Sequence, residues 1–142
     1  MSKVSNILAR KGSNIISVSP EITVHEALKV MSERNIGSVV VLDNGKYAGL
    51  LTERDYARKV ILLGRHSNET MVKDIMTTDL PSISRSHTVD DCMQLMSTRN
   101  IRYLPVIENN QLVGLLSIMD LVTETITIQK ETIDHLQNYI SQ

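Results

Sequence analysis

Two copies of one short motif carry the side chains that could do chemistry. Gly49-Leu-Leu-Thr52-Glu-Arg-Asp55 lies in the first half of the chain, and Gly114-Leu-Leu-Ser117-Ile-Met-Asp120 lies in the second. Each motif is expected to place a hydroxyl at the start of a helix, directly after a strand. A helix start presents free backbone N–H groups and the positive end of the helix dipole, which favour a phosphate. The Asp three residues later faces the same way and could accept hydrogen bonds from a ribose diol.

The same spacing also has a purely structural interpretation. Ser or Thr followed three residues later by an acid resembles a capping box. Thr23-x-x-Glu26 and Thr88-x-x-Asp91 show this spacing at other predicted helix starts, where no ligand is implied. The glycine that opens both motifs favours the ligand interpretation, because glycine allows another group to approach the backbone closely. Both interpretations stay open at this point.

The motifs belong to a longer internal repeat. From residue 18 to residue 56 the same kinds of residue return 65 positions later without a gap, as Asn35 returns at Asn100. The match includes special residues as well as the apolar pattern. Two copies of one supersecondary unit imply two similar surfaces related by a pseudo-two-fold axis. A site on one copy should therefore have a counterpart on the other.

Each copy is predicted to have the element order β-α-β-β-α. Apolar residues at i, i+3, i+4 and i+7 predict helices that begin at Val24 and Val89. Asn44-Gly45 between two apolar runs is the strongest short signal for a hairpin, and residues 103–116 repeat it. Short strands are expected at 15–18 and 80–83, and second helices from Thr52 to about Leu63 and from Ser117 onward. The expected fold class is therefore mixed α and β.

Segment 73–78 is expected to link the copies. Repeat 1 with the N-terminal segment would span residues 1–70, and repeat 2 with the C-terminal helix would span 71–142. The final helix, from Ser117 to Ile140, contains no Pro or Gly, and its apolar residues form an irregular stripe: Leu121, Val122, Ile126, Ile133, Leu136 and Ile140. A stripe that extends beyond one repeat usually finds a partner. We therefore expect a homodimer that uses the helices of the repeats, with this helix adding to the interface.

Composition excludes several classes of function. The 142 residues are 42% hydrophobic and 22% charged, as in an ordinary globular domain. The net charge of −1 argues against binding to nucleic acid or to an anionic membrane through the whole surface. No apolar run approaches membrane-spanning length, and the first residues lack the apolar core of a signal peptide. We therefore expect a cytoplasmic protein that has no membrane partner and for which the charge argues against nucleic acid as a partner.

No set of residues proposes a reaction or a metal site. The four histidines, His25, His66, His87 and His135, show no metal-ligand spacing. Cys92 falls on the apolar face of its helix, where a small core residue is expected rather than a reactive thiol. No Ser/His/Asp or Cys/His set is present, so neither catalytic residues nor a catalytic cofactor are predicted. The basic stretch from Arg54 to His66 is expected to be a solvated helix face.

The chain resembles a known family, the cystathionine-β-synthase (CBS) domain pair. The resemblance covers about residues 6–125. It rests on the two Gly-h-h-Ser/Thr-x-x-Asp motifs, on Asp74-Ile-Met-Thr77, and on Arg99-Asn-Ile-Arg-Tyr-Leu-Pro-Val106. It is closest in character to the small stand-alone CBS-pair proteins. The resemblance implies a tandem CBS pair that binds adenosine-containing ligands in the cleft between the repeats: AMP foremost, then ADP, ATP, NAD or S-adenosylmethionine.

In that family each nucleotide site mixes the two repeats. The hydroxyl and the carboxylate come from one motif, and the first strand and strand-entry residues come from the other repeat. Carried over by the resemblance, one site combines Ser117 and Asp120 with Asn14, Ile16, Ile36, Gly37 and Ser38. The other combines Thr52, Arg54 and Asp55 with Pro81, Ile101, Arg102 and Tyr103.

The two implied sites differ in charge. Arg102 stands where the first repeat has Gly37, and Arg54 stands where the second has Met119. A guanidinium can hold a phosphate through two hydrogen bonds, so the Thr52/Asp55 site is expected to hold the more highly charged ligand. The family pattern departs at Val40, where the second repeat has Pro105, and this difference should affect the strand edge more than the ligand.

The residues and the resemblance leave three functions to distinguish. The preferred one is a regulatory module that binds adenine nucleotide in two unequal clefts and signals occupancy to a partner protein. The alternative is a constitutive dimerisation or scaffold protein whose clefts are empty remnants. An enzyme would need catalytic groups that the sequence does not contain.

Overall fold

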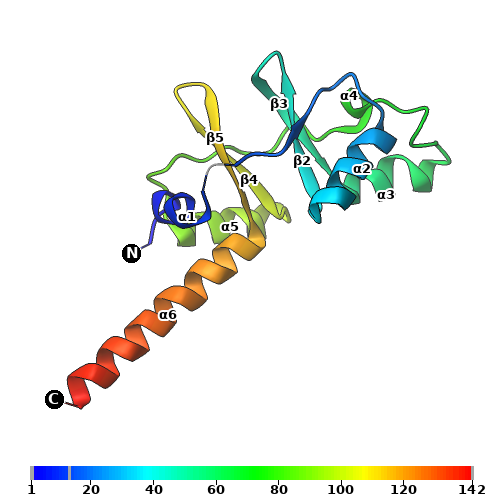
Figure 1. Cartoon of the computed structure of the whole chain (residues 1–142). Helices are drawn as coiled ribbons and strands as arrows, with labels where there is room; N and C mark the ends of the chain where they lie inside the picture. The colour runs from blue at the N-terminus through cyan, green and yellow to red at the C-terminus, as the bar shows by residue number, and fades with distance from the viewer. Residues whose placement is uncertain (1, 13, 142) are drawn as a thin grey trace. The chain divides into compact units, whose positions relative to one another are not determined.

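The structure, a computed structural model, describes residues 2–12 and 14–141 and groups the chain into two compact units (Figure 1). The first-repeat unit is Ile15–Leu80, and the second-repeat unit combines Met1–Asn14 with Pro81–Gln142. The expected division was after residue 70, whereas the observed units divide the chain near residues 14 and 80. The N-terminal segment packs with the second repeat, and residues 71–80 pack with the first.

The first-repeat unit contains a three-stranded sheet. Its strands are β1 (Ser17–Val18), β2 (Ser38–Asp43) and β3 (Lys46–Thr52), with β1 parallel and β3 antiparallel to β2. Its helices are α2 (Val24–Arg34), α3 (Glu53–Lys59), the 3-10 turn η1 (Ile61–Leu63) and α4 (Val72–Ile75). Val24, Ala27 and Met31 of α2 pack on Val39, Val41 and Leu51 of the sheet in one apolar cluster.

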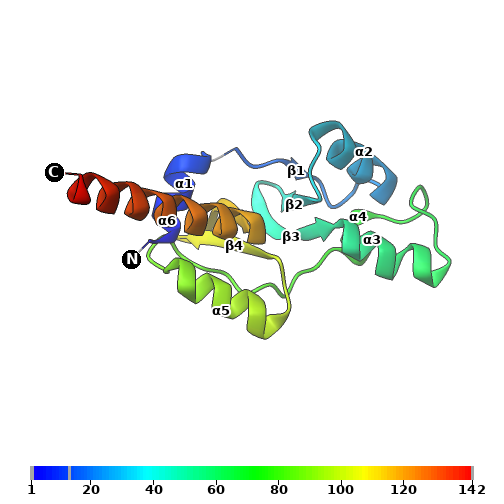
Figure 2. The same ribbon diagram turned by 90° about the horizontal axis from the view of Figure 1, so that it is seen from below.

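The second-repeat unit has the same plan. It contains α1 (Val4–Lys11), α5 (Val89–Arg99), the hairpin β4 (Tyr103–Glu108) and β5 (Gln111–Ser117), and the long α6 (Ile118–Ile140). Figure 2 shows α1 and α5 on either side of the start of α6. Its core joins Val4 and Ile7 of α1 to Cys92 and Met96 of α5 and to Leu104, Val106, Leu116 and Leu121.

The repeat is confirmed down to its backbone details. Both hairpins have the same register, with a bulge at Val41/Leu42 and at Val106/Ile107. Both tips use two consecutive positive φ angles, at Asn44-Gly45 and at Asn109-Asn110, as a two-residue turn of type I′ requires. The repeated Arg-Asn-Ile ends each first helix, with Asn35 and Asn100 in the left-handed conformation of a C-cap.

One predicted strand is absent from the described part of the second repeat, and Pro105 explains why. In the first repeat the Val40 N–H donates to the Ile16 carbonyl at 3.1 Å and extends β1. Pro105 occupies the equivalent position and has no N–H, so segment 80–83 keeps only a bridge between Ile83 and Val106. The expectation that Pro105 acts on the strand edge is confirmed.

The predicted helix from Thr52 to Leu63 is interrupted. Helix α3 ends at Lys59, and the chain continues as the turn η1 up to Gly64, which takes the left-handed conformation. Val60, between the two, is fully buried in the core of the first-repeat unit. The prediction was correct for the first two turns of the helix and wrong in extending the helix to Leu63 without a break.

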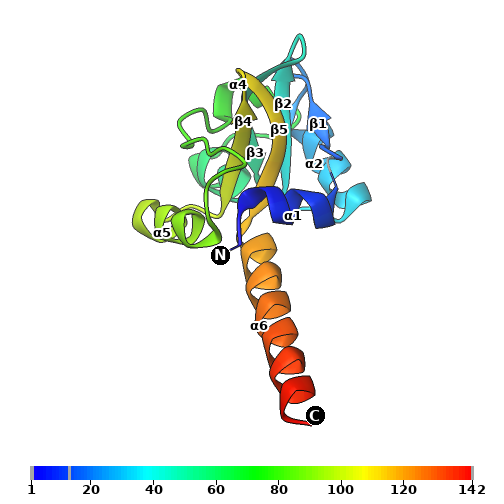
Figure 3. The same ribbon diagram turned by 90° about the vertical axis from the view of Figure 1, so that its left-hand side faces the viewer.

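Two short helices were not predicted, and they have the same role. Segment 73–78 was expected to be a linker, yet α4 begins at Val72 and docks through Val72 N–H to the Ile22 carbonyl at 2.9 Å. Helix α1 docks through Val4 N–H to the His87 carbonyl, also at 2.9 Å, and His87 is the repeat equivalent of Ile22. Figure 3 shows α1 crossing the β4–β5 hairpin where α6 begins. Each repeat is thus closed by a helix that precedes the other repeat in the chain.

Candidate functional site

Both motifs form complete capping boxes. Thr52 Oγ1 accepts from the Asp55 N–H at 3.0 Å, and Asp55 Oδ2 accepts from the Thr52 N–H at 3.0 Å. In the second motif Ser117 Oγ accepts from the Asp120 N–H at 3.2 Å, and Asp120 Oδ2 accepts from the Ser117 N–H at 2.7 Å. The structural interpretation of the spacing is therefore confirmed. In both motifs the box uses Oδ2, so Oδ1 of each carboxylate lies outside it.

The helix starts offer fewer backbone donors than expected. The first N–H of α3, at Glu53, donates to the Gly37 carbonyl at 3.1 Å. The first N–H of α6, at Ile118, donates to the Arg102 carbonyl at 2.9 Å. With the third N–H of each helix already bonded to Thr52 or Ser117, a phosphate would depend more on side-chain donors than on the helix end.

Asp55 is a buried carboxylate with several partners. Its residue is 7% exposed. Asp55 Oδ1 accepts from Thr77 Oγ1 at 2.9 Å and pairs with Lys59 Nζ at 3.0 Å. Lys59 also donates to the Ile75 carbonyl at 2.9 Å, which ties the end of α4 to α3. A ribose diol at Asp55 would have to replace the Thr77 hydroxyl or the Lys59 ammonium.

Asp120 is more accessible, and its partner comes from the N-terminal helix. Lys11 Nζ lies 2.7 Å from Asp120 Oδ2 and donates to the Leu115 carbonyl at 2.7 Å. The Asp120 side chain is 20% exposed and that of Lys11 is 37% exposed. Within residues 2–12 and 14–141, Asp120 Oδ1 has no hydrogen-bond donor. This oxygen is the acceptor best placed to receive a hydroxyl from a ligand.

The two motif glycines allow close packing within their own units. A Cβ at Gly49 would lie 2.7 Å from the Thr77 carbonyl oxygen, and a Cβ at Gly114 would lie 2.7 Å from Leu8 Cδ2. Thr77 follows α4 and Leu8 belongs to α1, so the equivalent glycines are contacted by the segment just after α4 in one unit and by α1 in the other. The close approach that the sequence indicated is real, and it is made by protein.

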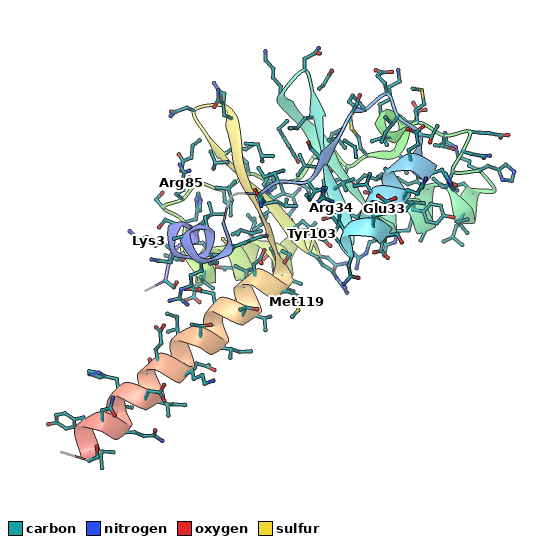
Figure 4. All side chains as sticks on the ribbon, viewed as in Figure 1. Lys3, Glu33, Arg34, Arg85, Tyr103 and Met119 are labelled. Atoms are coloured by element: carbon teal, nitrogen blue, oxygen red, sulfur yellow. The ribbon has the colours of Figure 1, made fainter. Side chains whose placement is uncertain are left out.

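The predicted site residues, including those of the motifs, are divided between the two units. The first-repeat unit holds Ile16, Ile36, Gly37, Ser38, Thr52, Arg54 and Asp55; the second-repeat unit holds Asn14, Pro81, Ile101, Arg102, Tyr103, Ser117 and Asp120. Arg102 and Asn14 are exposed, Ser38 is buried, and Arg54 and Tyr103 are half-buried. Figure 4 shows Tyr103 near the start of the β4 strand. Each predicted site draws on both units and therefore stays a prediction.

A surface groove of about 690 Å³ lies between α2 and α3 of the first-repeat unit. It includes two predicted residues, Ile36 and Gly37, together with Glu53 and Tyr56, but neither Thr52 nor Asp55. The groove therefore does not gather the hydroxyl and the carboxylate of the motif.

Three partners of the motif carboxylates were missed from the sequence. Lys59 stands four residues after Asp55, a spacing that predicts an ion pair on a helix. Thr77 follows the unpredicted α4, and Lys11 ends the unpredicted α1. The signal for α1 is present: Val4-Ser-Asn-Ile7 resembles Val72-Lys-Asp-Ile75, but at an offset of 68 rather than 65.

The remaining candidates for chemistry are the Cys92 thiol and possible metal ligands. Burial, followed by the nearby Asp91 carboxylate, raises the pKa of the Cys92 thiol to about 11, so the thiol stays protonated at neutral pH. Among residues 2–12 and 14–141, no group of three or more His, Cys, Asp or Glu side chains could hold a metal ion. In the same part of the chain, no helix has the length and apolar character to cross a membrane.

Comparison with known proteins identifies the family. The CBS domain model matches residues 4–61 and 72–126. The CBS domain-containing protein CBSX3, mitochondrial, of Arabidopsis thaliana is 36% identical over 96% of this chain and 71% of its own length. The CBS domain-containing protein YhcV of Bacillus subtilis is 34% identical over 83% of this chain and 84% of its own length.

Solved structures with a similar fold also contain CBS domains. A protein with CBS domains from Burkholderia ambifaria MC40-6 has a TM-score of 0.85 and is 41% identical, covering 89% of this chain and 95% of that one. The family model matches both repeats, and its two matched ranges begin at residues 4 and 72, where α1 and α4 begin. This chain therefore belongs to the CBS domain family, as a pair of CBS domains.

Proposed function

We propose that this CBS pair is a regulatory module that binds adenosine-containing nucleotides through its two motifs and signals their presence to a partner protein. CBS pairs are generally regulatory modules that bind adenosine ligands. The observation that supports the proposal for this chain is the state of Asp120. It sits beside the Ser117 hydroxyl at a helix start, and its Oδ1 has no donor among the described residues. Such an oxygen suits a ribose hydroxyl.

The proposed ligand is AMP, with ADP, ATP, NAD and S-adenosylmethionine as the other adenosine-containing candidates. As the family resemblance implies, each motif would be completed by strand-entry residues of the other repeat. The ligand would act by its differential affinity for two states of the module. The same proposal includes no catalytic role, a homodimer as the assembled form and the cytoplasm as the compartment.

Calorimetry of Asp120→Ala and Asp55→Ala with AMP tests the ribose assignment. A charge-assisted hydrogen bond contributes on the order of 1.5–3 kcal/mol, so each variant should lose about ten- to a hundredfold in affinity at one site. Asp91→Ala is the matched control. Asp91 caps α5 through the same box with Thr88 but lies outside both motifs, so its loss removes a cap without removing a ribose acceptor.

The control separates the two interpretations of the motifs. If Asp120→Ala and Asp91→Ala have the same AMP affinity and stoichiometry as the unmodified chain, the motif carboxylates serve only as caps. Asp55→Ala must be compared at matched temperature below its unfolding transition, because Asp55 also holds Thr77 and Lys59. Its stability loss is expected to exceed that of Asp120→Ala.

Arg102 tests the proposed asymmetry of the two sites. The side chain is exposed, while its backbone carbonyl is already bonded to Ile118. Arg102→Ala should lower affinity for AMP and ATP and change affinity for adenosine little, because a guanidinium binds phosphate in a charge-assisted way. It should also flatten the salt dependence of binding. Equal losses for adenosine and AMP would assign Arg102 a structural role.

The scaffold alternative makes an opposite prediction for ligand-induced stability. A ligand at 100 times its dissociation constant adds about 2.7 kcal/mol to the stability of the folded chain. A thermal-shift panel with AMP, ATP, NAD and S-adenosylmethionine should therefore show at least one clear increase in Tm. No increase with any of the four would favour a scaffold with empty sites.

A further inference from the structure

Helix α6 has an inner face that packs on its own unit. Leu121 and Glu124 are buried, and Glu124 accepts from the Ser2 hydroxyl at 2.7 Å and pairs with Arg10 at 3.3 Å. The last such contact is between Arg10 and Glu131 at 3.4 Å. Beyond it, the side-chain hydrogen bonds of the described residues of α6 stay within the helix. Figure 1 shows this distal half extending away from the rest of its unit.

The opposite face carries a regular heptad pattern. Seven residues follow one another at alternating spacings of three and four: Met119, Val122, Ile126, Gln129, Ile133, Leu136 and Ile140. Six of the seven are apolar, and those six are between 37% and 80% exposed. A helix turns by about 100° per residue, so this row lies opposite Leu121, Glu124 and Glu131. The stripe seemed irregular only because Leu121 of the inner face was counted with it.

We propose that this heptad face forms a parallel, in-register, two-stranded coiled coil with α6 of a second copy of this chain. In the heptad, Met119, Ile126, Ile133 and Ile140 take the a positions. Val122, Gln129 and Leu136 take the d positions. β-Branched residues at a with leucine at d favour two parallel strands; three of the four a positions here are isoleucine, and Leu136 is the one leucine at d. Figure 4 shows Met119 projecting from the first turn of α6, where the row begins.

Gln129 identifies the partner and its direction. In a parallel, in-register pair, Gln129 faces the same residue of the second copy, and two amides can hydrogen-bond each other. In an antiparallel pair each d position faces an a position, so the Gln129 amide would be buried against an apolar side chain at a cost. A polar residue at a single a position is known to specify register, and Gln129 places one polar residue in this seam at a d position.

The flanking positions are compatible with self-association. The e and g residues that approach each other across a parallel seam are Ile118 with Thr123, Thr125 with Lys130, and Thr132 with Gln137. None of these pairs opposes like charges. The face is thus self-complementary about a two-fold axis, as an isologous interface requires.

Disulfide trapping in the full chain tests direction and register. The background is Cys92→Ala, because the first repeat already has Ala27 at the equivalent position. Single cysteines at Val122 and at Leu136 occupy d positions 14 residues apart, which is about 21 Å along a helix. Both are expected to form covalent dimers under mild oxidation, and Asn138→Cys on the opposite face is expected to form at least tenfold less. Only a parallel, in-register pair can trap at both d positions.

Hydrogen exchange supplies a readout local to α6. Amides of residues 132–140 should lose at least tenfold in protection when Ile133 is replaced by Lys, while Asp134→Lys, at a b position, should leave it unchanged. Ile133 is 54% exposed, so the substitution should not disturb the core of its unit. Trapping at only one d position, trapping equal to Asn138→Cys, or unchanged exchange in Ile133→Lys would each overturn the proposal. None of these measurements depends on nucleotide binding.

Discussion

Lys11 is predicted to weaken nucleotide binding at the Asp120 motif. Its ammonium lies 2.7 Å from Asp120 Oδ2 and 2.7 Å from the Leu115 carbonyl oxygen. A ribose diol bound by both carboxylate oxygens must displace this lysine from Oδ2. The change that tests the competition is Lys11→Met, which keeps an unbranched apolar stem and removes the ammonium.

The size of the effect follows from the exposure of the pair. The two side chains are 37% and 20% exposed, so solvent screens their attraction, and pairs of this kind are typically worth about 0.2–1 kcal/mol. Removing the competitor should therefore raise the affinity for adenosine by about 1.4- to 5-fold. High salt weakens the ion pair, so the difference between Lys11→Met and the unmodified chain should shrink as salt is added.

Calorimetry with adenosine at low and high salt measures this difference. Lys130→Met is the matched control, because it removes one positive charge from exposed α6 surface away from both motifs. A lower affinity in Lys11→Met would mean that the ammonium contacts the ligand instead of competing with it. An affinity equal to that of Lys130→Met would mean that the ligand does not reach Asp120 Oδ2.

Two further predictions concern stability. Gly49→Ala should cost about 1–3 kcal/mol of unfolding free energy, because its Cβ would meet the Thr77 backbone oxygen at 2.7 Å, whereas Gly114→Ala meets the movable Leu8 side chain and should cost less; equal costs in urea denaturation would contradict this contrast. The raised pKa of Cys92 stabilises the fold fully below its ordinary value of 9.0, and this contribution should be lost as the pH rises toward about 11. Urea denaturation of Cys92→Ala, compared with the unmodified chain at the same pH values, should therefore show a flatter decline, and parallel declines would refute the assignment.

The elements that carry strong local signals could be predicted from the sequence. Periodic apolar residues located α2 and α5, and Asn-Gly located the first hairpin, because these signals depend on neighbours within a few residues. Helices α1 and α4 could not be located in this way. They are held by contacts with distant segments, such as Val4 with His87, and α4 is too short to show a period.

The capping pairs of the two motifs were predictable from the sequence, and the groups around the carboxylates were not. The pairing of Thr52 with Asp55 and of Ser117 with Asp120 is a local property of helix starts. The cations that hold the two carboxylates differ because the closing helices differ. Lys11 reaches Asp120 from the end of α1, while Asp55 is held by Lys59 of its own helix.

The exchange of closing helices makes the chain an insertion in topological terms. The first-repeat unit is one continuous stretch, Ile15–Leu80, whereas the other unit is assembled from both sides of it. Helix α1 is synthesised before all of its partners, and Ser2 meets Glu124 across 122 residues of chain. Contacts this distant in sequence are slow to form, and domains generally fold as units during synthesis. The inserted unit can therefore complete its core on the ribosome while the unit that contains Lys11 and Asp120 still waits for its second half.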